Sequence, residues 1–281
     1  MERHFLLISK PKGITSRKFL NKVQDAIGTE KVGHAGTLDP MASGLLFIGI
    51  GKATKLIQYV NLEPKEYVVQ IQFGIETDTN DITGKVLRNC RKPVTLYEFM
   101  NVIQGFKGKF FQMPPLFSAK KVSGIEAYKY ARKGEAINKL KPVEVEIYDI
   151  EVKSFLENTA VLRILCSKGT YMRALARDIG IRLQSCAVIS GITRTRLGRF
   201  TISDATTLTE IERGNFLRGF FSVDDVLDFS TVLLKNKAPF LNGNEIILER
   251  LIVKDKEGRL LGVGKVEQNS LKPEKVIYED I

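Results

Sequence analysis

Apolar residues recur along the chain with two periods, one typical of β-strands and one typical of α-helices. Residues 66–73 alternate, which predicts a strand with one buried face; the apolar positions are Tyr67, Val69, Ile71 and Phe73. The stretch 45–51, LLFIGIG, lacks this alternation and is bounded by glycine, so we expect a buried strand. Further strands are predicted around residues 4–9, 143–148, 160–166 and 191–200.

Helices are predicted where a 3.6-residue apolar period follows a capping residue. The first begins at Thr15 or Ser16 and ends at Gly28, and a second follows a capping box over 95–104. A third follows Thr170, its expected N-cap, and has its apolar positions at Met172, Leu175, Ala176, Ile179 and Leu183. Shorter helices are expected at 52–62, at 127–132 and after a capping box at 207–210.

This alternation of helices and strands predicts an α+β (mixed α/β) fold for most of the chain. Beyond about Asp228 the pattern changes to short β segments, with a turn at 255–258 between two of them. We therefore expect a main domain over residues 1–228 and a small β-rich domain over 229–281.

The composition of the chain indicates the kind of partner that it binds. The 281 residues include 43 Lys and Arg against 32 Asp and Glu, a formal net charge of +11. Such a balance favours a polyanionic partner, most commonly a nucleic acid. The sequence shows neither a signal-peptide core nor a membrane-spanning run, so we expect a soluble, cytoplasmic protein without membrane contact.

Cysteine and histidine usage excludes some chemistry. The three cysteines, Cys90, Cys166 and Cys186, lie far apart and form no CxxC pair, so we expect neither a disulfide framework nor a zinc site. A reducing compartment fits this usage best. With His4 and His34 as the only histidines, a histidine-based metal site is not expected.

The most informative stretch is 33–40, GHAGTLDP. Gly33 and Gly36 allow positive φ or a close approach by another group, and Pro40 pushes Asp39 toward extended geometry. A short polar loop beside a buried strand is suited to holding one carboxylate still. The alternative is that Asp39 only starts a turn, as most aspartates before proline do.

A second candidate is Arg173, which the predicted N-cap places in the first turn of its helix. A cation there opposes the helix dipole, so a carboxylate from another segment or a bound phosphate must compensate it. Asp39 is one possible partner, since a bidentate pair would keep it ionised and oriented. The alternatives are an ordinary surface arginine at 173 and an ordinary core tyrosine at Tyr67.

Two further patterns leave alternatives open. The carboxylate-rich loop 76–84, ETDTNDITG, departs from a calcium-binding loop and predicts a turn with internal side-chain hydrogen bonds. Lysines and arginines near aromatic residues suit a nucleic-acid surface, although alternating core phenylalanines and solvated lysines give the same pattern. The candidate contacts to phosphates are Lys10, Lys12, Lys120, Arg132, Arg194 and Arg196.

Six motifs occur in the order and spacing of one known family. They are KPKGITS, GHAGTLDPMASGLL, KEYVV, TDTNDITG, QMPPLFSAKKVSGIEAYKYARKG and CSKGTYMRALARDIG, within about residues 5–200. In this arrangement the chain resembles the bacterial tRNA pseudouridine-55 synthases, the TruB family. The resemblance implies a mostly antiparallel central sheet flanked by helices, followed by a C-terminal PUA-like RNA-binding domain. The tail of this chain is short and matches that domain poorly.

The resemblance also implies site residues. Asp39 matches the catalytic aspartate of the family, Tyr67 the tyrosine that stacks on the target base, and Arg173 the arginine paired with the aspartate. His34 matches the histidine that helps to extrude the uridine. Tyr171 and Ile192 match positions that line the uracil pocket.

The implied reaction isomerises uridine 55 in the T-arm loop of tRNA without a cofactor or metal. A carboxylate can attack the sugar, attack the base or remove a sugar proton, and the sequence leaves these routes open. No obligatory protein partner is implied, and we expect a monomer. The competing hypotheses are a non-catalytic tRNA-binding chaperone and a guide-RNA-dependent synthase; a phosphatase is disfavoured because a second carboxylate is lacking after Asp39.

Overall fold

The computed structural model describes residues 4–29, 31–117, 121–122, 125–126, 140–215, 218–234, 250–267 and 270–277. Two compact units divide the chain. Unit 1 comprises residues 1–40, 45–61 and 203–281, and unit 2 comprises 41–44 and 62–202. Each unit is therefore built from more than one segment of the sequence.

Unit 1 contains a small sheet with helix α1 beside it. Its elements before residue 62 are β1 (Phe5–Lys10), α1 (Ser16–Ile27), β2 (Val32–Ala35), β3 (Ser43–Ile50) and the 3-10 helices η1 (Gly51–Lys55) and η2 (Ile57–Tyr59). Those after residue 202 include α5 (Leu208–Glu212) and β14 (Phe220–Phe221), preceded by η3 (Ile202–Asp204) at the boundary. The strands follow the order β14-β1-β3, with β2 paired to β3. The predicted helix at 52–62 is thus two short 3-10 segments.

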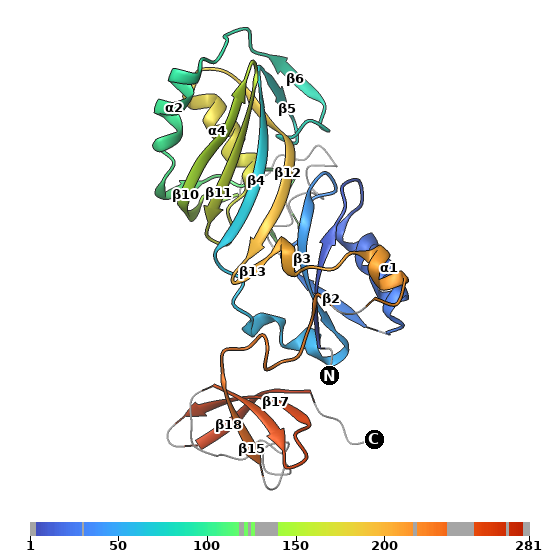
Figure 1. Cartoon of the computed structure of the whole chain (residues 1–281). Helices are drawn as coiled ribbons and strands as arrows, with labels where there is room; N and C mark the ends of the chain where they lie inside the picture. The colour runs from blue at the N-terminus through green and yellow to red at the C-terminus, as the bar shows by residue number, and fades with distance from the viewer. Residues whose placement is uncertain are drawn as a thin grey trace. The chain divides into compact units, whose positions relative to one another are not determined.

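The end of the chain forms a separate four-stranded sheet, as the pattern of short β segments predicted (Figure 1). Its order is β15-β16-β17-β18, and the strands are Ser230–Leu234, Leu251–Asp255, Leu260–Glu267 and Ser270–Val276. The turn between β16 and β17 is closed by Asp255, whose carboxylate accepts hydrogen bonds from the backbone N–H groups of Glu257 and Arg259. The mixed fold with a small C-terminal sheet is confirmed, while the boundary at 228 stays a prediction.

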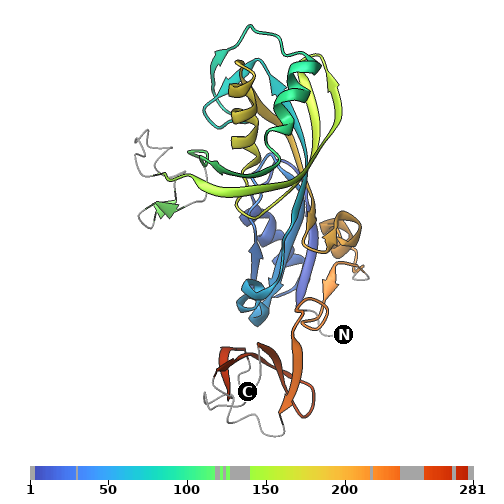
Figure 2. The same cartoon turned by 90° about the vertical axis from the view of Figure 1, so that its left-hand side faces the viewer.

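Unit 2 is an antiparallel sheet covered by two helices on one face (Figure 2). The strands follow the order β12-β4-β11-β10-β7: Ala187–Leu197, Lys65–Phe73, Thr159–Cys166, Val143–Leu156 and Gly108–Gln112. Strand β13 (Phe200–Thr201) pairs with β12. Helices α2 (Leu96–Gln104) and α4 (Met172–Arg182) pack on the buried face, where the four predicted positions of β4 lie. The core therefore sits between this sheet and these helices.

Short hairpins complete unit 2. Strands β5 (Ile75–Thr77) and β6 (Val86–Asn89) form one, and β8 (Lys121–Val122) and β9 (Ile125–Glu126) form another. The predicted helix at 127–132 lies outside the described residues.

The helix caps follow the sequence closely. The side chain of Thr15 caps α1, and Gly28 ends it with φ of 65°. Capping boxes begin α2 at Thr95 and α5 at Thr207. Helix α4 differs by one residue, since Tyr171 is its N-cap and the Thr170 hydroxyl instead donates to the carbonyl of Ser167.

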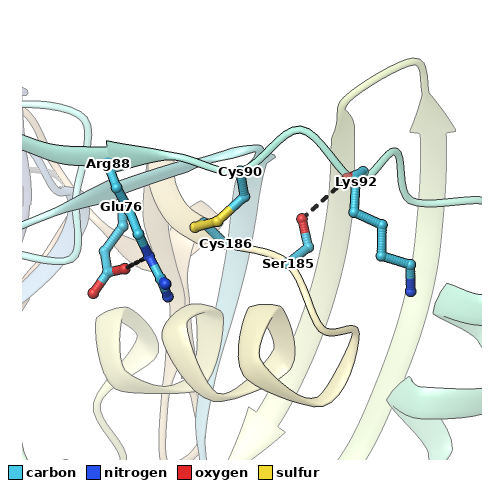
Figure 3. The surroundings of a disulfide bond; sticks show 6 residues. All are labelled: Glu76, Arg88, Cys90, Lys92, Ser185 and Cys186. Carbon is cyan, nitrogen blue, oxygen red and sulfur yellow. Dashed lines mark hydrogen bonds and ion pairs between the residues drawn. A yellow bond between two sulfur atoms is a disulfide. The ribbon is translucent and has the colours of Figure 1, made fainter.

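The expectation of no disulfide is wrong for one pair of cysteines. Cys90 and Cys186 are joined, with Cα atoms 5.7 Å apart and a sequence separation of 96 (Figure 3). Nearby, Ser185 donates to the carbonyl of Lys92, which ties the same two segments together at 3.2 Å. Sequence spacing alone did not reveal the pair because hairpin β5–β6 brings Cys90 back to the turn after α4. The third cysteine, Cys166, is a buried free thiol.

Candidate active site

The loop that carries Asp39 is held on both sides of the aspartate. The backbone N–H of Leu38 donates to the Ser16 hydroxyl at 2.9 Å, and that hydroxyl donates back to the Leu38 carbonyl at 2.8 Å. On the other side, the N–H of Gly13 donates to the carbonyl of Pro40 at 2.8 Å. Leu38 is buried, whereas Asp39 itself is only partly buried. The backbone therefore fixes the position from which the carboxylate extends.

Strand β2 leads into this loop and carries His34. It pairs with β3 so that His34 lies opposite Ile48. A Cβ at Gly33 would lie 3.3 Å from Cγ2 of Thr54 in η1, so glycine here permits close packing of η1 on the hairpin. Gly36 has φ of 68° at the turn that follows. The two glycines thus serve the two purposes that the sequence predicted, one each.

Tyr67 stands on the buried face of β4, with 8% of its surface exposed. Its neighbours across the sheet are Ile164 of β11 and Arg194 of β12. Ile192 packs against the same core from β12 and is partly exposed. Tyr67 and Ile192 therefore belong to the same core of unit 2, as an aromatic residue and an aliphatic residue on neighbouring strands.

The start of β3 is fitted closely to β12. The Ser43 hydroxyl is 2.9 Å from the Thr193 hydroxyl, and Ser43 and Gly44 pair in parallel with Thr193 and Arg194. A Cβ at Gly44, where φ is 99°, would lie 2.2 Å from the carbonyl oxygen of Arg194. Only glycine allows this approach.

Arg173 is in the first turn of α4, as predicted, and is buried with 7% of its surface exposed. Its guanidinium donates to the carbonyl oxygens of Thr79 at 2.9 Å and Phe117 at 2.7 Å. The carboxylate of Asp81 lies 3.7 Å from its Nη1 atom. The compensating carboxylate is thus supplied in unit 2 by Asp81, and the pairing of Arg173 with Asp39 stays a prediction.

Asp81 is itself held within the loop between β5 and β6. It is buried, and its carboxylate accepts hydrogen bonds from the backbone and the hydroxyl of Thr83. Its carbonyl accepts from the Thr77 hydroxyl at 2.7 Å. The turn with internal side-chain hydrogen bonds is confirmed, but its role in holding Arg173 was missed. The long sequence separation between the loop and α4 left no local signal for that contact.

Tyr171 is positioned by a residue that sequence reasoning also missed. Its N–H donates to Oε1 of Gln112 at 2.8 Å, and its carbonyl accepts from Nε2 of the same amide at 3.2 Å. Gln112 is 1% exposed at the end of β7, so both polar ends of its side chain are satisfied by one residue. This clamp sets the position of Tyr171 immediately before α4.

Residues 24–172 match the family described as TruB family pseudouridylate synthase (N terminal domain). This match spans more than half of the chain. The chain belongs to the TruB family. It is therefore a pseudouridine synthase, an enzyme that isomerises uridine in RNA.

Relatives and a solved structure are similar to this chain over nearly its full length. A protein from Caldanaerobacter subterraneus subsp. tengcongensis named tRNA pseudouridine synthase B is 38% identical and covers 96% of this chain and 98% of its own. One of the same name from Thermosipho melanesiensis is 37% identical over 95% and 92%. An archaeal box H/ACA sRNP Nop10-Cbf5 complex contains a chain with the same fold, at a TM-score of 0.69 and 19% identity over 98% and 86%.

Two of the residues predicted to contact RNA phosphates in this TruB-family synthase are buried. Lys10 is fully buried and donates from Nζ to the carbonyls of Pro11 and Ile14, each at 2.8 Å, so it organises its own turn. Arg194 is only 1% exposed because it faces inward from β12. Neither has the surface position that the phosphate-contact prediction requires.

The other predicted contacts divide in a different way. Lys12 is exposed. Arg196 is partly buried and donates from Nε to the carbonyl of Gly198 at 2.7 Å. Lys120 and Arg132 lie outside the described residues. Among the helices of the described part of the chain, none is long and apolar enough to cross a membrane.

Three ionisable groups at the start of β4 have shifted pKa values. Burial raises the pKa of the Cys166 thiol to about 11, so this cysteine is a neutral thiol at physiological pH. Burial, together with the nearby Arg194 guanidinium, lowers the pKa of Lys65. For Glu63, hydrogen bonds from the backbone and side chain of Lys168 outweigh the effect of burial and lower its pKa.

Proposed function

We propose that this synthase converts uridine 55 in the T-arm loop of tRNA to pseudouridine, with Asp39 as the catalytic aspartate. The observation that carries the proposal is family membership, together with relatives named tRNA pseudouridine synthase B that align over nearly the full chain. The net charge of +11 supports a polyanionic substrate.

The reaction is an isomerisation and needs no external oxidant or reductant. The bond from N1 of uracil to C1′ breaks, a bond from C5 to C1′ forms, C5 loses a proton and N1 gains one. In this proposal the Asp39 carboxylate starts the reaction by attack or by proton removal. Two backbone anchors, at Leu38 and at Pro40, support this role because they restrict where the carboxylate can lie.

The remaining site residues are proposed to position the uracil base and to stabilise the charge of the catalytic carboxylate. Tyr67 serves as an aromatic wall against the flipped uracil, and Ile192 and Tyr171 line the same pocket. Arg173 supplies a positive charge that favours an ionised catalytic carboxylate. His34 helps to displace the uridine from its stacked position in the loop. The fixed geometry of Arg173 supports its part, because a cation held by Thr79, Phe117 and Asp81 needs little reorganisation.

The test uses the purified chain alone with an unmodified tRNA transcript. Chemical mapping of pseudouridine is expected to show one new site, at position 55, and no product with a transcript that carries cytidine there. Product that appears only after a guide RNA or a protein partner is added would contradict the proposal. Binding without product by the wild-type chain would favour a non-catalytic chaperone instead.

A further inference from the structure

Lys65 begins β4 two residues before Tyr67, so the two side chains point to the same face of the sheet. It lies opposite Cys166 of β11 and Leu197 of β12, both fully buried. Lys65 itself is only partly buried. Lys65 is therefore at the start of β4, near Tyr67, and part of its surface is exposed.

In the part of the chain that the structure describes, the ammonium of Lys65 has no hydrogen-bond or ion-pair partner. The carboxylate that acts on its charge, Glu63, is already bonded twice by Lys168, through its backbone N–H at 3.1 Å and its Nζ at 3.0 Å. The other charged neighbours are two cations, the buried Arg194 and Lys168. A partly buried lysine beside a second cation costs folding free energy unless something compensates it.

The surrounding backbone adds to the positive potential. The Cys166 thiol beside Lys65 is hydrogen-bonded to the side chain of Thr170, which directly precedes the N-cap of α4. That N-cap makes no side-chain capping bond, and the first turn of α4 holds no acidic residue. The helix dipole therefore contributes positive potential near the Lys65 side chain. An anion from outside the protein fits this environment.

We propose that Lys65 binds a backbone phosphate of the RNA at or next to the nucleotide whose base lies against Tyr67. The inference rests on the proposed function, because it takes the position of the base from Tyr67. Two residues along a strand span about 7 Å. One nucleotide can therefore place its base on Tyr67 and an adjoining phosphate on Lys65. Binding would give the ammonium the partner that it lacks in the free enzyme.

The first experiment compares Lys65→Met with wild type in binding a T-arm stem-loop RNA over a range of salt concentrations. Methionine keeps the length of the side chain and removes its charge. We expect affinity to fall roughly three- to tenfold at low salt, and the slope of log affinity against log salt to fall by about 0.7 to 1. The matched control, Lys153→Met, removes a lysine paired with Glu151 on β10 and is expected to leave the slope unchanged.

Thermal unfolding separates a binding role from a structural one. Because the Lys65 ammonium is partly desolvated and unpaired, Lys65→Met is expected to keep or raise the melting temperature. A fall in melting temperature with an unchanged salt slope would assign Lys65 to folding and overturn the inference.

A second experiment identifies the phosphate. Stem-loops that carry a neutral methylphosphonate at single linkages around the target uridine are bound to wild type and to Lys65→Met. One linkage is expected to weaken wild-type binding and leave Lys65→Met unaffected, the non-additivity that a direct contact produces. If every linkage weakens both proteins equally, Lys65 touches no phosphate and the proposal fails.

The pH profile provides a third readout. The neighbours that set the charge of Lys65 are Arg194, Cys166, Glu63 and Lys168. Affinity is expected to fall at alkaline pH as Lys65 loses its proton, and Lys65→Arg is expected to keep affinity at that pH. Unchanged binding by Lys65→Met together with product from wild type overturns only this inference. A wild-type chain that binds the stem-loop but makes no pseudouridine overturns the proposed function, while the salt slope still tests Lys65.

Discussion

Asp39 and Arg173 are both charged residues of the proposed site, and the hydrogen bonds that the structure describes around them are of different kinds. The position of Asp39 is set through the backbone of its neighbours, by Ser16 on one side and Gly13 on the other. Arg173 is held through its own guanidinium, by two carbonyls and a carboxylate. Both sets of hydrogen bonds restrict the position of a charged residue, which is what a preorganised site requires.

The largest effect is expected when the carboxylate of Asp39 is removed and the backbone hydrogen bonds on both sides of it are kept. Asp39→Asn retains the backbone hydrogen bonds of Leu38 and Pro40, so folding and tRNA binding should change little. Pseudouridine formation is expected to fall by about 10³-fold or more. Single-turnover assays and a binding titration measure the two quantities. Activity within tenfold of wild type would remove Asp39 from the mechanism.

The role of Arg173 is tested by changing the shape of its charged group. Arg173→Lys keeps the charge but cannot reproduce a planar fork that reaches Thr79, Phe117 and Asp81 together. We expect kcat to fall on the order of 10²-fold. Arg182→Lys is the control, because this arginine ends the same helix, where it stacks over Phe106 and donates to the Gly105 carbonyl. Equal losses in both variants would show that general damage to α4 explains the effect.

A smaller effect should follow from loosening the anchor of the Asp39 loop. Ser16→Ala leaves the N–H and carbonyl of Leu38 buried without their partner, at a cost of about 1–3 kcal/mol in the free energy of unfolding. We also expect kcat to fall several-fold. Thr15→Ala, one residue earlier, removes only the helix cap and about 1 kcal/mol. If both variants keep full kcat, the loop does not need this anchor.

The smallest effect is expected at Glu210, which belongs neither to the Asp39 loop nor to the contacts of Arg173. Hydrogen bonds from the Thr207 backbone and the Arg218 side chain lower its pKa to about 2, from an ordinary value of 4.5. Its stabilising contribution is therefore complete above about pH 4.5 and is lost as the pH falls toward 2. Glu210→Gln should lower the melting temperature slightly at pH 7, and this difference should shrink on acidification. Pseudouridine formation at neutral pH should not change.

The sequence predicted those parts of the molecule that depend on local physics. The alternation around Tyr67 gave the buried face of β4, and the capping residues gave the starts of α1, α2 and α5. The dipole argument at Arg173 called for a carboxylate from another segment or a bound phosphate, and Asp81 supplies a carboxylate. The strand and the helix caps depend on residues that lie within a few positions of one another. The dipole argument predicts only that a negative charge is needed, without naming the residue that supplies it.

What the sequence missed depends on contacts between distant segments. Asp81 meets Arg173, and Gln112 meets the backbone of Tyr171, only because the chain returns to the same place. Lys10 and Arg194 carry the charges of a phosphate-binding surface, yet the strands turn both of them inward. Residue type predicted a charge at each position but not the direction in which it points.

In the proposed function, this chain alone performs the isomerisation at uridine 55 and uses Asp39 to do so. The most direct test maps pseudouridine in unmodified tRNA after treatment with purified wild type or Asp39→Asn. We expect a single new pseudouridine at position 55 with wild type and none with the variant. Equal product from both proteins, or product at another position, would contradict it.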